Sequence, residues 1–332
     1  NRINNFSRTP DGKRLLVASY SDVSPVRYYM YDEAAKTIEQ IGSSRPWLDG
    51  KLTEQRIMTF KTRDGLEIPG YYFLPKNYKP GTKLPTVVHI HGGPFARADR
   101  FGSGFGYIEG QLLASRGYAV IVPNFRVTPG LGSKIYYAGF GSYGRQMSDD
   151  HEDALQWGIE QGFVDPANVC ISGASYGGYA ALQALVRNND MWKCAVAGLA
   201  VTDLEYQLTS RDGDSAGNTS GVDYWKSVLG VQDLNSPLVK EISPVFHAGR
   251  ISVCRRRRHS RADQADRADG QGTGTQRQPA EGLRGQGRRG PWLRQAGKQR
   301  RPVHAGVGVS QVRNWRRQVT AIRRNRQLHQ QK

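Results

Sequence analysis

The spacing of apolar and polar residues changes along the chain near residue 55. Before that point, short segments rich in β-forming residues predict strands over residues 14–19, 28–31 and 37–41. Residues 6–13 are rich in turn-forming residues. Residues 1–50 are therefore expected to form one small β unit, such as the last blade of a truncated β-propeller.

From residue 56 onward, apolar runs alternate with segments of helical periodicity. A hairpin is expected around the Asp64-Gly65 turn, and residues 149–162 place apolar side chains at helical spacing. The other apolar runs predict buried strands. The predicted strands are residues 57–62, 68–74, 84–91, 118–123 and 195–201. Strands that alternate with helices are typical of an α/β fold with a mainly parallel, doubly wound sheet. Residues 55–253 are expected to form this domain, in incomplete form.

The run from Val169 to Leu182 carries the chemistry. It consists of a β-branched segment, a Gly-x-Ser-x-Gly turn centred on Ser175 and a helix of small residues, which is the pattern of a nucleophile elbow. The turn leaves no room for side chains at Gly173 and Gly177. The serine hydroxyl then lies at a helix N-terminus, where backbone N–H groups point at a developing oxyanion. The alternative is an ordinary tight turn whose serine caps a helix.

Three sequence blocks together resemble one family. They are Val88 to Pro94 (Val-His-Ile-His-Gly-Gly-Pro), Asn124-Phe125-Arg126 with the glycine-rich residues 129–132, and Gly173 to Tyr179. These blocks are similar to the oxyanion loop, the next strand's loop and the elbow of the prolyl oligopeptidase family of serine peptidases, an α/β-hydrolase family. The dipeptidyl-peptidase and acylaminoacyl-peptidase branches are the most similar. The resemblance covers about residues 55–250, and residues 1–50 resemble the propeller blade that precedes that domain.

The resemblance implies a role for each matching residue. Ser175 would be the nucleophile, and the backbone N–H of Tyr176 would be one oxyanion donor. The loop at His91 and Gly92 would supply the other donor. The reaction would be acyl transfer to serine followed by hydrolysis, with peptides as substrates and no cofactor or metal. A serine hydroxyl also needs a base, usually a histidine oriented by an aspartate.

The charge of the chain is concentrated at its end. Of the 47 Lys and Arg residues in the chain, 21 lie in residues 254–332, where only 4 of the 29 acidic residues lie. This segment holds two aromatic residues, Trp292 and Trp315, and too few apolar residues to bury a core. The apolar pattern of the preceding domain stops at Val253, where the next strand is expected.

A shifted reading frame explains this break. Read one base out of register, the codons of residues 258–270 permit Asp-Ile-Arg-Val-Pro-Ile-Lys-Gln-Thr-Glu-Gln-Met, and those of 289–294 permit Glu-Asp-His-Gly-Phe. The codons of residues 302–311 permit Leu-Tyr-Thr-Arg-Val-Trp-Glu-Phe-Leu-Lys. These readings resemble the Asp loop, the His loop and the last helix of the family, in that order. Residues 254–332 are therefore expected to be an Arg-rich, out-of-frame and disordered tail.

The shifted frame would remove the acid and the base of the triad. None of His259, Asp263, His304 and His329 lies in a matching motif. The sheet would also lose its last strands, which leaves apolar surface uncovered. We therefore expect a poorly folded and nearly inactive protein.

Other polar groups are assigned structural roles. His89 is expected to be a strand residue, and His247 is not expected to be the base, because no His-Gly turn follows a strand there. The acidic residues 149–153 fit a negatively charged helix start better than a metal cluster. Residues 212–218 lack two ligands of a calcium loop and favour a polar loop. Cys170 and Cys194 are expected to be small core residues.

Three functions compete at this level. The first is the serine peptidase, and the second is a carboxylesterase on the same fold. The third is a non-catalytic protein whose basic tail binds nucleic acid, although the tail has no recognition motif. No run of about 18 apolar residues predicts a membrane span. The chain does not begin with Met and is expected to be a fragment, so a cytoplasmic and a periplasmic location both stay open, as does the oligomeric state.

Overall fold

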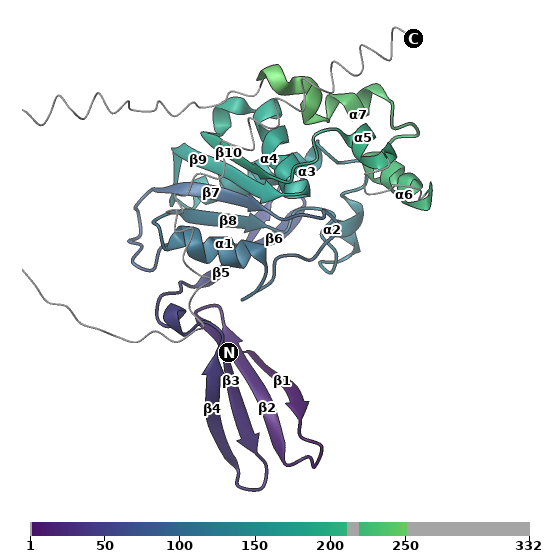
Figure 1. Cartoon of the computed structure of the whole chain (residues 1–332). Coiled ribbons are helices and arrows are strands. Elements are labelled where there is room, and N and C mark those ends of the chain that lie inside the picture. The colour runs from purple at the N-terminus through teal and green to yellow at the C-terminus, as the bar shows by residue number, and fades with distance from the viewer. Residues whose placement is uncertain (1, 211–218, 251–332) are drawn as a thin grey trace, which may run out of the picture. The chain divides into compact units, whose positions relative to one another are not determined.

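The computed structural model describes residues 2–210 and 219–250 (Figure 1), with side chains from residue 7. The polar loop predicted at 212–218 and the Arg-rich tail from 254 lie outside the described residues. So do His259, Asp263, His304 and His329, which match no motif of the family.

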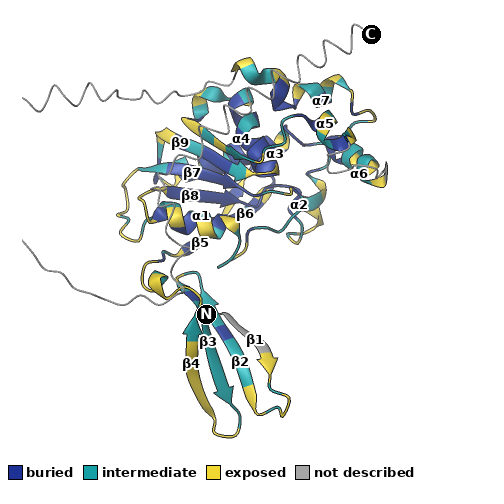
Figure 2. Cartoon of the chain, in the orientation of Figure 1, coloured by how far each residue is buried: buried dark blue, intermediate teal, exposed yellow. Residues whose placement is uncertain are grey.

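The N-terminal strands form one antiparallel sheet in sequence order. They are β1 (Arg2–Arg8), β2 (Arg14–Ser21), β3 (Ser24–Asp32) and β4 (Thr37–Ser43). The three predicted strands are confirmed, but the turn predicted at residues 6–13 is too long, because β1 extends to Arg8. Among the described side chains of this sheet only Ala18 and Pro25 are buried (Figure 2). A sheet with so little core of its own is typical of a propeller blade, which packs against neighbouring blades.

A second sheet has six strands in the order β10-β9-β7-β8-β6-β5. The pairs among β7, β8, β9 and β10 are parallel, whereas β5 pairs with β6, and β6 with β8, in antiparallel fashion. This mixed, mainly parallel sheet confirms the predicted fold class. The strands are β5 (Gln55–Lys61), β6 (Glu67–Phe73), β7 (Leu84–Ile90), β8 (Ala119–Pro123), β9 (Val164–Ala174) and β10 (Cys194–Gly198).

Helices cover both faces of this sheet. Neighbouring residues of a strand point to opposite faces. In β8, the Val122 side chain meets Gly106 of α1, while the Ile121 side chain meets Gly158 of α3. The predicted helix at 149–162 corresponds to α3, which begins three residues earlier. The α-helices are α1 (Phe105–Ala114), α2 (Ser133–Tyr137), α3 (Gln146–Glu160), α4 (Tyr176–Arg187), α5 (Leu204–Thr209), α6 (Thr219–Leu229) and α7 (Pro237–Glu241). No helix among the described residues is long and apolar enough to span a bilayer.

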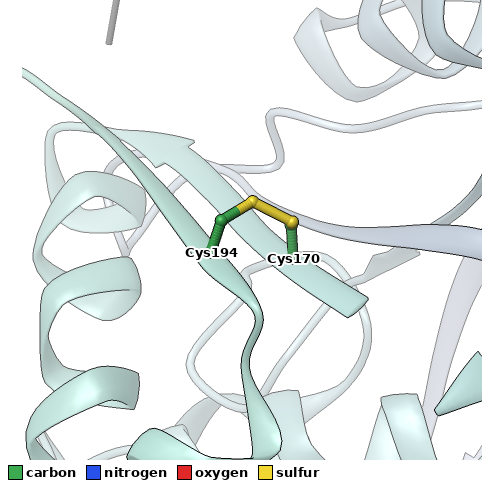
Figure 3. The surroundings of a disulfide bond; sticks show 2 residues. All are labelled: Cys170 and Cys194. Atoms are coloured by element: carbon green, nitrogen blue, oxygen red, sulfur yellow. A yellow bond between two sulfur atoms is a disulfide. The ribbon is translucent and has the colours of Figure 1, made fainter. Parts of the chain in front are cut away.

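Cys170 and Cys194 form a disulfide between β9 and β10 (Figure 3). The two residues are register partners, with a Cα–Cα distance of 4.6 Å. Cys194 is exposed and Cys170 is half-buried, so their prediction as small core residues was wrong. The physical reason is position, because β10 is the edge strand of the described sheet and lacks cover on that side.

Candidate active site

Ser175 lies at the turn between β9 and α4. Its backbone has φ 57° and ψ −117°, a conformation that costs free energy for any residue with a Cβ. The Ser175 N–H donates to the Gly198 carbonyl at 2.9 Å, and the Ser175 carbonyl accepts from the Tyr179 N–H at 3.0 Å. These bonds to β10 and α4 hold the strained residue, and its side chain is exposed.

The glycines around Ser175 are sterically required, as predicted. A Cβ on Gly173 would lie 2.3 Å from the Ile90 carbonyl oxygen, and a Cβ on Gly177 would lie 2.0 Å from the same atom. A Cβ on Gly178 would lie 2.4 Å from the Gly198 carbonyl oxygen. The ends of β7 and β10 therefore lie directly against the elbow.

Two sets of backbone atoms lie close to the serine. Tyr176 is the first residue of α4, so its N–H belongs to the helix N-terminus, where the helix dipole favours negative charge. Gly92 is in the loop after β7, and a Cβ placed on it would lie 3.3 Å from the Ser175 Cβ. The arrangement brings together three of the residues named from the sequence, Ser175, Tyr176 and Gly92.

The His91 imidazole is buried behind this loop. Its Nδ1 lies 2.8 Å from the Gly92 carbonyl oxygen, its Nε2 lies 3.2 Å from the Thr128 hydroxyl, and its ring stacks on Phe125 with centroids 4.4 Å apart. A carbonyl can only accept, so Nδ1 carries the proton and Nε2 accepts from Thr128. Burial lowers the pKa of His91. The neutral side chain thus orients the Gly92 peptide, and both of its ring nitrogens are engaged away from Ser175.

The other described histidines are also engaged away from the serine. His89 lies 3.0 Å from a Glu109 carboxylate oxygen and 3.2 Å from the Ser172 hydroxyl. The His247 Nε2 lies 2.6 Å from the Glu241 carbonyl oxygen. His151 is buried against aromatic rings, with its Nε2 lacking a partner. Among the described residues, no histidine therefore hydrogen-bonds to Ser175.

A small pocket with both polar and apolar surface borders the serine. Its walls come from the loop after β7, from the segment after β10 and from α5 and α6. The lining residues are Gly93, Tyr143, Ser175, Tyr176, Val201, Leu204, Gln207, Leu208 and Trp225.

The acidic residues of α3 pair with arginines. Asp150 is fully buried and accepts from the Arg126 guanidinium at 2.8 Å, while Arg126 also donates to Asp64 at 2.8 Å. Arg126 holds the pKa of Asp64 well below its usual range. Arg63 donates to Asp153 at 2.7 Å. The interpretation as a helix start is therefore incomplete, because only Asp149 lies in the first turn.

Arg126 fixes the loop that carries Phe125 and Thr128, the two residues in contact with His91. The sequence analysis did not predict the buried ion pair between Arg126 and Asp150. The available signal was an arginine three positions after the end of a buried strand. In the described part of the chain, no group of three metal-binding side chains is close enough to hold an ion.

Comparisons with known proteins agree with this geometry. Residues 104–248 match the model of the prolyl oligopeptidase family. Dipeptidyl aminopeptidase BIII of Pseudoxanthomonas mexicana is 38% identical over 211 residues, which are 61% of this chain and 30% of that protein. Mouse dipeptidyl peptidase 8 is 37% identical over 153 residues, which are 45% of this chain and 17% of that protein. The chain thus spans less than a third of these relatives.

Solved structures show the same fold. Acylaminoacyl peptidase of Pyrococcus horikoshii superposes with a TM-score of 0.56 at 26% identity, over 73% of this chain and 37% of that one. A puromycin-hydrolyzing peptidase of Mycobacterium tuberculosis gives a TM-score of 0.60 at 24% identity, over 72% of this chain and 36% of that one. The second likeness concerns the fold alone.

Proposed function

We propose that this chain, whose α/β domain is of the prolyl oligopeptidase type, contains the nucleophile half of a serine peptidase that cleaves oligopeptides. The observation that carries the proposal is the strained Ser175 at the N-terminus of α4, with the Gly92 loop beside it. Strain of this kind persists only where surrounding structure enforces it, and it is typical of active sites.

The chemistry follows from the geometry. The Ser175 hydroxyl oxygen attacks the carbonyl carbon of a peptide bond, and the carbonyl oxygen becomes an oxyanion. The Tyr176 N–H and the backbone of the Gly92 loop would donate to that oxyanion. The amine leaves with a proton, and water then hydrolyses the acyl-serine.

The proton transfers need groups that the described residues do not bring to Ser175. We infer that the acid and the base are encoded one base out of register after Val253. Loss of the base in a serine peptidase lowers kcat by about 10⁶-fold, and a residual rate comes from the oxyanion hole and from binding. The chain as given is therefore expected to be nearly inactive.

Labelling with a fluorophosphonate tests the nucleophile. We expect slow, stoichiometric labelling of the full chain, which disappears in Ser175→Ala and persists in Ser115→Ala, a matched change at an exposed serine. Labelling that survives in Ser175→Ala would assign the reactivity to another residue and overturn the proposal.

Resequencing the codons of residues 250–260 tests the frame. If the shift is real, a gene restored to the second frame, with any missing strand residues replaced, should raise peptide hydrolysis by several orders of magnitude. Hydrolysis of chromogenic peptides by the chain as given, at a kcat of about 1 s⁻¹ or more, would contradict the inference.

A panel of esters and blocked peptides separates the peptidase from a carboxylesterase. Salt-sensitive binding of nucleic acid that depends on residues 254–332 would instead favour a binding role.

A further inference from the structure

A second pocket lies among the loops at the end of the sheet that carries the elbow. Its volume is about 460 Å³, which is within the range of small-molecule sites. The loop after β7, the loop after β8 and β6 provide the walls. The lining residues are Tyr71, Arg97, Arg100, Phe101, Pro129 and Gly130.

Two arginines give this pocket its charge. The Arg97 Nη1 donates to the Gly130 carbonyl at 2.9 Å, and the Arg100 Nε donates to the Arg97 carbonyl at 3.3 Å. Neither guanidinium pairs with a carboxylate in the described part of the chain, in contrast to Arg63 and Arg126. The carboxylate between them in sequence, Asp99, is buried and accepts from the Gly106 N–H of α1.

Most donors of the two guanidinium groups are left for a ligand. Among the described residues, the Arg97 group bonds only through its Nη1 and the Arg100 group only through its Nε. The Arg97 Nε is itself buried without a partner, so a ligand would meet this guanidinium at its Nη atoms. The planar guanidinium fork matches the two oxygens of a carboxylate. The rings of Tyr71 and Phe101, with centroids 6.5 Å apart, add an apolar wall.

The pocket is within reach of the nucleophile. Gly92 lies beside Ser175, and Arg97 is five positions further along the chain, so the Gly92 and Arg97 Cα atoms are at most about 18 Å apart. An extended peptide of four or five residues covers such a distance. A peptide whose scissile bond lies at Ser175 could therefore place a carboxylate between the arginines.

We propose that Arg97 and Arg100 form a carboxylate-binding subsite for the peptide substrate. The proposal rests on the proposed function, because it takes the ligand to be a peptide that also reaches Ser175. The carboxylate comes from the C-terminus of a short peptide or from an acidic side chain. Either source would make the protein prefer short or acidic peptides over neutral, blocked ones.

Calorimetric titration of the full chain tests the subsite without relying on turnover. Three peptides are compared: tetra-alanine with a free C-terminal carboxylate, its C-terminal amide, and the amide with one alanine replaced by aspartate. We expect the free acid, the aspartate peptide or both to bind at least tenfold more tightly than the neutral amide. Whichever of the two binds more tightly identifies the source of the carboxylate.

Variants separate the subsite from general charge. The double variant Arg97→Gln/Arg100→Gln should lose the preference for the peptides that carry a carboxylate. Arg97→Lys should retain part of the preference, and Arg116→Gln, a change at an exposed arginine outside the pocket, should retain all of it. Circular dichroism spectra that match the parent chain verify that each variant is folded.

Three results would overturn the subsite: equal binding of all three peptides, no binding of any of them, or a preference that persists in the double variant. Fluorophosphonate labelling of Ser175 is scored separately. Labelling without a carboxylate preference refutes the subsite alone, whereas a preference without labelling refutes the proposed function alone.

Discussion

His151 makes the chain sensitive to mild acid. This residue of α3 is 1% exposed, and its ring packs edge-on against Phe125 with centroids 5.0 Å apart. Its Nε2 has no hydrogen-bond partner in the described structure. Burial lowers the pKa of His151 to about 3. The folded protein therefore keeps a neutral imidazole at every pH at which the unfolded chain begins to take up a proton.

The sign and size of the effect follow from proton linkage. The unfolded imidazole has a pKa near its ordinary value of 6.5. Between that value and about 3, the unfolded state binds a proton that the folded state does not, so the free energy of unfolding falls as the pH falls. Lowering the pH from about 7.5 to about 5 should cost about 2 kcal/mol through His151.

His151→Phe removes the titrating group and keeps a ring against Phe125. Urea unfolding, followed by tryptophan fluorescence, gives the free energy of unfolding of the parent and the variant at pH 7.5 and pH 5. Relative to the parent, the free energy of unfolding of the variant should rise by about 2 kcal/mol as the pH falls from 7.5 to 5. Burial raises the pKa of Asp150 to about 7 while Arg126 opposes the shift, but this carboxyl titrates in both chains and cancels.

His247→Gln is the matched control, because that imidazole is only partly buried near the end of the described chain. In this control, the change in unfolding free energy between pH 7.5 and pH 5 should stay within about 0.5 kcal/mol of the change in the parent. The linkage reasoning is wrong if His151→Phe and the parent lose stability in parallel between pH 7.5 and pH 5. It is also wrong if the control removes the dependence as effectively as His151→Phe.

Three further changes test the packing around the site. Gly177→Ala should cost at least about 3 kcal/mol of unfolding free energy and abolish fluorophosphonate labelling, whereas Gly249→Ala, which meets no atom within 4 Å, should do neither. Cys170→Ser opens a disulfide loop with a sequence separation of 24 residues and should lower the free energy of unfolding by about 3 kcal/mol. Reductant should then have no further effect on the urea midpoint. Arg126→Met should cost about 3–5 kcal/mol, because it leaves Asp150 buried without a partner, and adding Asp150→Leu should recover much of that loss.

The parts of the fold that the sequence predicted are those with strong local patterns. The runs at β7 and β8 consist mainly of apolar residues, and both strands are largely buried at the centre of the sheet. The glycines of the elbow could be understood from the turn alone. In contrast, α1 contains Gly106 and Gly110, which disfavour helix. Close packing of those glycines against Val122 and Phe73 outweighs their low helix propensity. No local sequence pattern predicts that contact.

The features that the sequence did not predict depend on register and long-range contact. The Cys170–Cys194 disulfide requires the parallel register of β9 and β10, which residue spacing does not supply. The pair between Arg126 and Asp150 joins residues on a loop and a helix that are 24 positions apart. His91 matched an oxyanion loop by motif, but only the structure shows that its imidazole holds the Gly92 carbonyl and not a ligand.

The supports of Ser175 explain how half of a catalytic site can persist. Its hydrogen bonds go to Gly198 and Tyr179, and its neighbouring glycines contact the Ile90 carbonyl, so each of these supports precedes Val253. Under the proposed function, a base would have to come from another loop. A frame change after Val253 would then leave the attack geometry intact while removing proton transfer. Slow labelling at Ser175 together with negligible peptide turnover is the combination that distinguishes such a chain from one whose elbow has collapsed.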